Sequence, residues 1–175
     1  MDLISFDLNT KIRLIKLEDA FSFFELIESN RSYLKQWLTW PDNMSSLAVA
    51  EKYIHSRIKL ASNNMGFCFV ILFKENIAGV IHLVDIDHQN RKAMIGYWVG
   101  QSFAGKGLAT KATQALLDFS KEKLSLHRIE IRCAVGNFPS EAISKKLQFH
   151  HEGLLRESEW LHDKFVDQNL YSKIL

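Results

Sequence analysis

The sequence predicts a mixed α/β fold, of the α+β kind, around a largely antiparallel sheet. Three apolar runs follow a helical first third with no helix between them, at 67–73, 77–84 and 91–99. A glycine loop and a helix come next, and two further strand-like stretches, 149–160 and 164–174, close the chain. Strands joined without a crossover helix pair antiparallel. The order therefore predicts a twisted, mostly antiparallel sheet of about seven strands flanked by helices.

The first third is predicted to hold one strand and three helical pieces. Residues 11–17 alternate like a strand, and the acidic pair that follows suits the positive end of a helix dipole. Apolar side chains at helical spacing continue over 21–27. An aromatic-rich second helical piece covers 33–40 and is ended by a proline. Two serines then begin a third helix, 45–61, as caps.

The rest of the chain alternates between strands and helices. The three apolar runs form a predicted meander, and the helix after the glycine loop runs to about Lys123. Residues 127–135 alternate as a strand and 140–147 are helical. The last two strands meet at a turn around His162 and Asp163.

The composition is that of an ordinary globular protein, and one domain, residues 1–175, is expected. The formal net charge of +2 is too small to argue for a nucleic-acid partner, and no apolar run is long enough to cross a bilayer. The start of the chain does not read as a signal peptide. Cys68 and Cys133 lie in apolar stretches, so we expect a cytoplasmic protein with reduced thiols. No metal-ligand spacing occurs, so no metal is predicted.

The most informative segment is a strand, a glycine loop and a helix at 96–110. Gly100, Gly105 and Gly107 lie within eight residues, and the helix follows directly. This arrangement directs backbone N–H groups and the positive end of a helix dipole at one spot, and glycines permit left-handed backbone angles there. A tight turn without a ligand is the plain alternative. Three glycines favour an anion site.

Two phosphate-binding motifs fit this loop poorly. The dinucleotide fingerprint requires Gly or Ala where Thr110 stands. The nucleotide P-loop matches at Gly100, Gly105 and Lys106, but Gly107 takes the place of the Ser or Thr that holds Mg²⁺. A P-loop nucleotide-binding protein therefore stays a minority alternative.

A third pattern fits better. Ala104-Gly105-Lys106-Gly107-Leu108-Ala109 resembles the pyrophosphate loop of the GCN5-related N-acetyltransferase (GNAT) superfamily, which reads Arg or Gln, then Gly-x-Gly-x-Gly or Ala. The sequence departs from this pattern at its first position, where Ala104 replaces Arg or Gln. Residues 137–153 are similar to the second block of the family, with Gln148 where Gly is usual. The front and the tail of the chain resemble the ribosomal-protein N-terminal acetyltransferase (Rim-type) branch.

The resemblance covers nearly the whole chain and implies an acetyl-CoA-dependent N-acetyltransferase. It implies acetyl-CoA as cosubstrate, a primary amine as acceptor, and in this branch the N-terminal α-amine of a ribosomal protein. It also implies a homodimer. An acetyltransferase for a small amine, such as a polyamine or an antibiotic, is the nearest alternative. A non-catalytic acetyl-CoA sensor on the same fold is another.

The resemblance also implies cofactor contacts. The strands at 95–99 and 128–134 would splay, so that the pantetheine arm bonds to exposed backbone. A backbone N–H aimed at the thioester oxygen contributes on the order of 10²-fold or more in rate. Asn137 would contact the cofactor arm, although a turn-forming Asn before Pro139 explains it equally well. The predicted cofactor residues are Trp98, Val99, Ala104, Gly105, Lys106, Gly107, Leu108, Ala109 and Asn137.

Two residues are predicted to be catalytic. By resemblance Ser140 is the acid that protonates the leaving thiolate, and it reads equally well as a helix N-cap. Glu159 is the candidate base, acting directly or through water on the incoming ammonium, a role that supplies roughly 10²–10⁴-fold. Strand alternation puts Glu157 on the same face, so it stays an alternative. Trp37 and Trp40 are predicted to be core residues, in a region that borders the acceptor site in this family.

Overall fold

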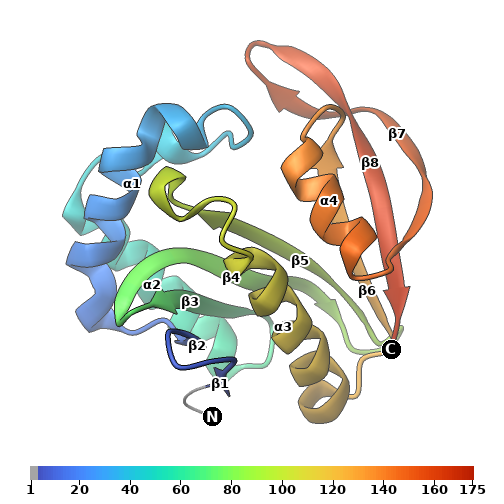
Figure 1. Ribbon diagram of the computed structural model, residues 1–175, viewed down its shortest axis with the longest axis horizontal. Coiled ribbons are helices and arrows are strands. Elements are labelled where there is room, and N and C mark those ends of the chain that lie inside the picture. The colour runs from blue at the N-terminus through green and yellow to red at the C-terminus, as the bar shows by residue number, and fades with distance from the viewer. Residues whose placement is uncertain (1–3) are drawn as a thin grey trace.

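The computed structural model describes residues 4–175 as one continuous sheet with helices on both faces (Figure 1). Within these residues the sheet has eight strands in the order β1-β2-β3-β4-β5-β6-β8-β7. Every neighbouring pair is antiparallel except β5 and β6, which are parallel. This confirms the predicted mixed α/β fold with a mostly antiparallel sheet. The two-residue β1, Ile4–Ser5, adds to the seven strands expected.

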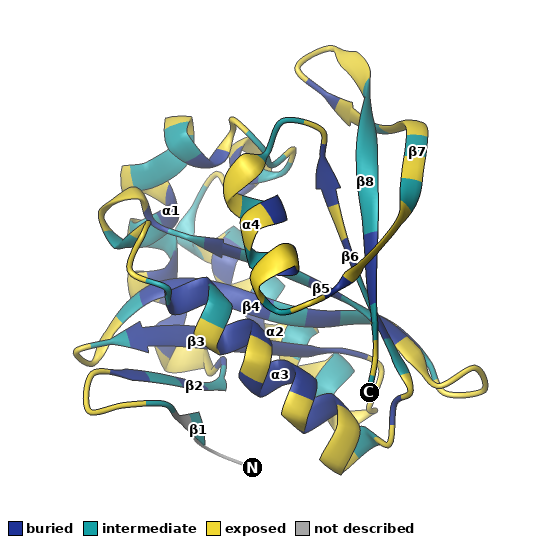
Figure 2. Cartoon of the chain, turned by 45° about the vertical axis from the view of Figure 1, so that its right-hand side comes forward, coloured by how far each residue is buried: buried dark blue, intermediate teal, exposed yellow. Residues whose placement is uncertain are grey.

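The other strands lie where the apolar alternation places them. Their bounds are Thr10–Leu14 for β2, Phe67–Phe73 for β3, Asn76–Asp87 for β4, Lys92–Val99 for β5, Arg128–Ala134 for β6, His150–Leu161 for β7 and Lys164–Ile174 for β8. Figure 2 shows the central strands buried and β7 largely exposed. The sheet is therefore well covered at its centre and open at the hairpin of β7 and β8.

Four α-helices in the described chain cover the two faces. They are α1, Ala20–Leu34, α2, Leu47–Ser62, α3, Leu108–Leu124, and α4, Phe138–Lys146. Alternation along β3 explains the division, because successive side chains point to opposite faces. Cys68 and Val70 pack in the cluster under α1 and α2, whereas Phe69 and Ile71 pack in the cluster under α3. Two cores thus hold the sheet from opposite sides.

The loop between α1 and α2 corrects one prediction. The second helical piece expected over 33–40 is wrong, because α1 ends at Leu34 and turns lead to a short 3-10 helix at Pro41–Asn43. The Arg31 guanidinium donates to the carbonyl oxygens of Pro41 and Met44 and so draws the loop back onto α1. The capping prediction is confirmed at Ser46, whose Oγ accepts from Val49 N at 3.4 Å.

The parallel pair β5 and β6 is joined at one end only. Paired residues run from Lys92↔Arg128 to Met94↔Glu130. From Ile95 onward no described residue of β5 pairs with β6, and the two strands diverge in Figure 1. The splay expected for these strands is therefore present, and it leaves an open backbone edge in the middle of the sheet.

The two cysteines lie on opposite faces of the sheet. Cys68 belongs to the core under α1 and α2, and Cys133 to the core under α3, and both are free and buried. Within residues 4–175 no helix is both long and apolar enough to span a membrane.

Candidate active site

The glycine loop connects β5 to α3 by two left-handed residues. Gly105 and Gly107 both have φ +74°, and Gly107 is the N-cap of α3. A Cβ at either glycine would meet no atom within 4 Å, so these positions require glycine for its backbone angle rather than for space. No side chain of the described chain caps α3. The amides of its first turn therefore lack intrahelical acceptors and form, with the helix dipole, a site for an anion.

The residues around these glycines divide into two kinds. Ala104 and Lys106 are exposed, and the Lys106 ammonium lies 5.9 Å from the centroid of the Phe73 ring. Leu108 and Ala109 are buried, so their side chains anchor α3 while their amides stay at its open end. The loop therefore presents backbone N–H groups and one cation.

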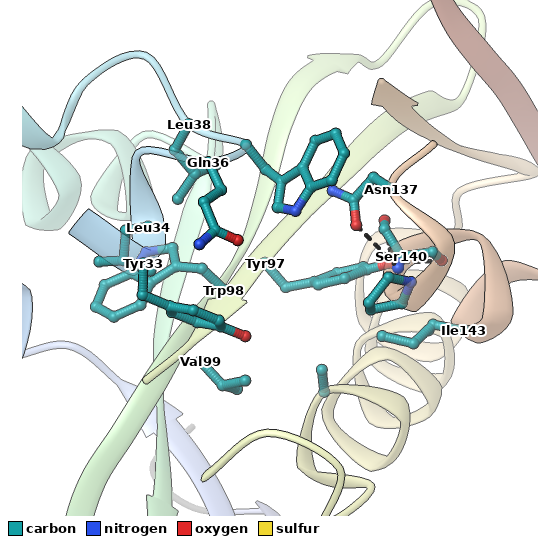
Figure 3. A pocket seen from close by; sticks show the side chains of 13 residues that line it. Tyr33, Leu34, Gln36, Leu38, Tyr97, Trp98, Val99, Asn137, Ser140 and Ile143 are labelled. Atoms are coloured by element: carbon teal, nitrogen blue, oxygen red, sulfur yellow. Dashed lines mark hydrogen bonds between the residues drawn. The ribbon is translucent and has the colours of Figure 1, made fainter. Parts of the chain in front are cut away.

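A cleft of about 220 Å³ lies beside this loop (Figure 3). Residues from the end of α1, from the diverging part of β5 and from the start of α4 line it. They are Tyr33, Leu34, Gln36, Trp37, Leu38, Tyr97, Trp98, Val99, Ala109, Asn137, Pro139, Ser140 and Ile143. Of the predicted site residues, the cleft brings together Trp98, Val99, Ala109, Asn137 and Ser140.

The start of α4 corrects the alternative role considered for Ser140. Asn137 is the N-cap, since its Oδ1 accepts from Ser140 N at 3.3 Å. Ser140 is thus inside the first turn, and the interpretation of Ser140 as the cap is wrong. Because Asn137 satisfies the backbone amide, the Ser140 hydroxyl is left for other partners.

Tyr97 is the lining residue outside the predicted set that contacts a predicted catalytic side chain. The Tyr97 hydroxyl lies 3.0 Å from Ser140 Oγ, a contact in which either hydroxyl can donate, and 3.3 Å from the Ser140 carbonyl oxygen, which can accept the same Tyr97 hydrogen. Burial raises the pKa of Tyr97 to about 12, although the hydrogen bond with Ser140 opposes that rise. Burial also raises the pKa of the Cys133 thiol, which lies beside Ser140, to about 11. The available sequence signal was a hydroxyl-bearing aromatic residue in the apolar strand that leads into the glycine loop.

The two candidate bases turn out to have different surroundings. A register shift between Leu155 and Glu159 interrupts the pairing of β7 with β8, and Glu157 has φ +49° there. The expected alternation, which placed both acids on one face, is therefore wrong. Glu157 is exposed, whereas Glu159 is half-buried and its Oε2 accepts from Gln168 Nε2 at 2.9 Å. Burial raises the pKa of Glu159.

Glu159 and Ser140 lie on opposite faces of the sheet, Ser140 in the cleft beside the gap between β5 and β6, and Glu159 on the edge strand β7, which β8 separates from β6. Asn169 Nδ2 donates to Glu141 Oε1 at 3.2 Å, so Asn169 faces α4. Its neighbour Gln168 must then face the other side, because adjacent strand residues point to opposite faces. Glu159 is held by Gln168 on that second face. A proton donor on one side and a proton acceptor on the other are what a group transfer requires.

A second cavity, of about 540 Å³, lies between the loop after α1 and the β7–β8 hairpin. It is lined by Ser32, Lys35, Gln36, Trp37, Ala134, Val135, Leu161, His162, Lys164 and Val166. Gln36 and Trp37 also line the first cleft, so the two spaces adjoin. Val166 is the cross-strand partner of Glu159, which places this cavity next to the candidate base. None of the described residues that line it is an acid.

These features define a class of protein. An uncapped helix beyond a glycine loop suits a pyrophosphate, and an open strand edge suits an arm that carries amide groups. A hydroxyl beside the gap and a half-buried carboxylate on the other face of the sheet suit a leaving group and an incoming nucleophile. Such a site belongs to an acyltransferase that uses coenzyme A. Within the described residues, no cluster of three or more His, Cys, Asp or Glu side chains is arranged to hold a metal ion.

Comparison with known proteins identifies the family. The chain belongs to the acetyltransferase (GNAT) domain family, whose model matches residues 9–150. It is 32% identical over 152 residues to the ribosomal-protein-serine acetyltransferase of Escherichia coli (strain K12), which covers 87% of this chain and 85% of that protein. It is 35% identical over 162 residues to the putative ribosomal N-acetyltransferase YdaF of Bacillus subtilis (strain 168), covering 92% and 88%.

A solved structure supports the same assignment. RimL, described as a ribosomal L7/L12 alpha-N-protein acetyltransferase in complex with coenzyme A, superposes with a TM-score of 0.96 at 27% identity, covering 99% of this chain and 98% of that one. The resemblance to the GNAT superfamily and its Rim-type branch is thereby confirmed. This protein is an acetyl-CoA-dependent N-acetyltransferase, and the P-loop alternative is excluded.

Proposed function

We propose that this enzyme acetylates the N-terminal α-amine of a ribosomal protein. The observation that carries this proposal is the second cavity, which shares Gln36 and Trp37 with the first cleft and is lined by Val166, the cross-strand partner of Glu159. Lys35 and Lys164 line it, and no described lining residue is an acid. A polyamine needs complementary negative charge, which this lining lacks. An extended chain end fits such a cavity, and the names of the two relatives that are 32% and 35% identical agree with this acceptor, whereas the spermidine N(1)-acetyltransferase of Escherichia coli (strain K12) is 26% identical.

The glycine loop and the open end of α3 are proposed to hold the cofactor pyrophosphate. The amides at 105–109 supply the donors, Lys106 adds a charge, and Ala104 contributes backbone only. When bound, acetyl-CoA supplies the thioester and therefore the activated acetyl group. The backbone geometry fits this group, because the donors form a cradle that no protein side chain of the described chain occupies.

The edge of β5 is proposed to polarise the thioester carbonyl. Gly100 N donates to Ala78 O at 2.9 Å, so this residue turns its amide toward β4. Backbone groups alternate in direction along an antiparallel pair, and the amide of Trp98 therefore also faces β4. The amide of Val99 faces the gap. The sequence predicted the backbone N–H groups of Trp98 and Val99 as donors, and of these two the N–H of Val99 points toward the developing oxyanion.

Ser140 and Glu159 are proposed to move the protons. A free α-amine has a pKa near 7.7–8.0, so much of it is protonated at neutral pH and a base is required. Glu159 would take this proton directly or through water, and burial makes its carboxylate a better acceptor than an exposed one. Ser140 would protonate the leaving thiolate from the α4 side. The presence of both groups argues against a non-catalytic sensor.

A direct assay tests this acceptor assignment. Ribosomal proteins purified without N-terminal acetylation are incubated with the enzyme and acetyl-CoA, and mass spectrometry locates the added acetyl groups. We expect modification at an N-terminal α-amine and a much lower rate with spermidine at equal concentration. Modification confined to lysine side chains, or a faster rate with spermidine, would contradict the proposal. Peptides with a blocked N-terminus serve as controls.

The family resemblance also leads us to propose a cytoplasmic homodimer. Trp160 and Phe165 at the tip of the β7–β8 hairpin are 53% and 60% exposed and stack edge-to-face at 4.8 Å. Large apolar side chains exposed together often mark an interface. Sedimentation velocity at several protein concentrations measures the oligomeric state, and a monomer at all of them would contradict the proposed dimer.

A further inference from the structure

We propose that Tyr97 is a positioning residue for the acid, holding the Ser140 hydroxyl as a donor toward the leaving sulfur and passing it a proton. This inference rests on the proposed function, which makes Ser140 the acid. It adds a residue from β5 to a proton path otherwise confined to α4. It also explains why an aliphatic hydroxyl, a weak acid by itself, is adequate at this position.

The geometry places Tyr97 across the gap from α4. Beyond Met94 the strand β5 has left β6, so the Tyr97 side chain spans the space between β5 and the first turn of α4. Its hydroxyl lies 3.0 Å from Ser140 Oγ, and both residues line the first cleft. Figure 3 shows the Tyr97 ring extending toward Ser140 at one end of the cleft. Ser140 is thus held twice, at its amide by Asn137 and at its hydroxyl by Tyr97.

The direction of this hydrogen bond decides what Ser140 offers to the cleft. The single hydroxyl hydrogen of Tyr97 has two acceptors within reach, and Ser140 Oγ at 3.0 Å is nearer than the Ser140 carbonyl oxygen at 3.3 Å. A phenol is also the stronger acid and therefore the better donor of the two hydroxyl groups. When Tyr97 donates to Ser140 Oγ, the hydrogen of Ser140 is free to point into the cleft. The phenol of Tyr97 is protonated at neutral pH, as the ordinary pKa of 10 already ensures, and burial raises that pKa further, to about 12. Cys133 also lies beside Ser140, but a thiol is a weak donor.

The proton balance is complete without a further reactant. As the acceptor amine forms its bond to the acetyl carbon, the carbon–sulfur bond breaks and its electron pair stays on sulfur. Ser140 gives its hydroxyl proton to that sulfur, and Tyr97 gives its own proton to Ser140 Oγ. Water then restores the phenol, while Glu159 releases the proton of the amine to water on the other face. An acceptor that arrives as an ammonium loses two protons in all, both passed to water through Glu159, and the thiolate takes up one, so the reaction releases one proton overall.

The first test compares three variants in the acetyl transfer reaction, with an N-terminal peptide as acceptor. Tyr97→Phe removes only the hydroxyl, and we expect kcat to fall about tenfold or more while KM for acetyl-CoA changes less than about twofold. Ser140→Ala should fall further. The double variant should be no slower than Ser140→Ala, because Tyr97 acts only through Ser140. Tyr53→Phe, which removes the hydroxyl of a partly buried tyrosine packed on the opposite face, should leave kcat unchanged.

A second readout needs no turnover. Thermal unfolding of the ligand-free variants forms a double-mutant cycle, in which the double variant should lose less than the sum of the two single losses. Purely additive losses would show that the two hydroxyl groups do not interact and would overturn the proposal. So would a Tyr97→Phe variant with full kcat, or a double variant slower than Ser140→Ala. Full activity of Ser140→Ala would instead remove the acid role from the proposed function itself.

Discussion

The glycine loop and the β7–β8 hairpin carry the proposed cofactor side and the proposed acceptor side of the site, and they are built differently. The loop is one short segment whose donors are backbone amides, and two left-handed glycines are enough to arrange them. The hairpin presents a side chain, Glu159, whose place depends on a register shift and on a bond from Gln168 in the neighbouring strand. The cofactor side should therefore tolerate side-chain changes that keep its backbone angles. The acceptor side should fail when one side chain changes.

Substitution of Glu159 tests the acceptor side and should have the largest effect. We expect Glu159→Gln to lower kcat/KM by about 10²–10⁴-fold, because the amide keeps the shape but cannot take a proton. Glu157→Gln is the matched control, since Glu157 is exposed and lies within the register shift, whereas Glu159 is half-buried. Steady-state rates at neutral pH measure both. Equal losses in the two variants would show that the distinction between the two acids is wrong.

The dependence of kcat/KM on pH gives a second test of Glu159 as the base. Burial raises the pKa of Glu159 above its ordinary value of 4.5. Its basic form is therefore lost as pH falls through that raised pKa, and kcat/KM should decline on the acid side at a higher pH than an exposed carboxylate allows. This acid limb should disappear in Glu159→Gln. A limb that persists in that variant would belong to another group.

On the cofactor side, the largest expected effect lies at Gly79 in β4. A Cβ there would lie 2.2 Å from Trp98 O and 2.7 Å from Val99 Cα, both backbone atoms of β5. Gly79→Ala must push the two strands apart, and we expect the free energy of unfolding to fall by about 1–3 kcal/mol. Because Val99 carries the proposed oxyanion donor, kcat should fall as well. Gly96→Ala is the control, since its Cβ would meet only His82 Cδ2 at 3.7 Å.

The sequence predicted the parts of the molecule that local pattern determines. Apolar alternation placed the strands, and the glycines placed the left-handed turn before α3. What it missed depends on contacts between distant segments. The loop after α1 is drawn back by the Arg31 guanidinium, which donates to the carbonyl oxygens of Pro41 and Met44, ten and thirteen residues further along the chain. At the register shift, the Glu157 amide donates a hydrogen bond to Asp167 Oδ1 of the neighbouring strand at 2.8 Å. Tyr97 meets Ser140 only because β5 leaves β6, a feature of pairing rather than of residue type.

Alanine at Gly107 probes the backbone of the loop directly. At φ +74° a Cβ costs about 1–2 kcal/mol even where space is free, as it is here. We expect Gly107→Ala to raise KM for acetyl-CoA about tenfold, since the turn must relax and misdirect the first amides of α3. Calorimetric titration of coenzyme A measures the lost affinity. Unchanged affinity would show that the left-handed turn is not what holds the pyrophosphate.

Arginine at position 104 should have the smallest effect, and in the favourable direction. Ala104 is exposed at the mouth of the loop, where the family pattern has Arg or Gln. A surface charge pair contributes about 0.2–1 kcal/mol, so Ala104→Arg should lower KM for acetyl-CoA by a few-fold at most, with kcat unchanged. High salt should abolish the gain, because exposed charges are screened, and Ala104→Gln should show little salt dependence. A fall of about a hundredfold in KM for acetyl-CoA would mean that side chains contribute more than backbone amides to cofactor binding. The proposed difference between the glycine loop and the β7–β8 hairpin would then be wrong.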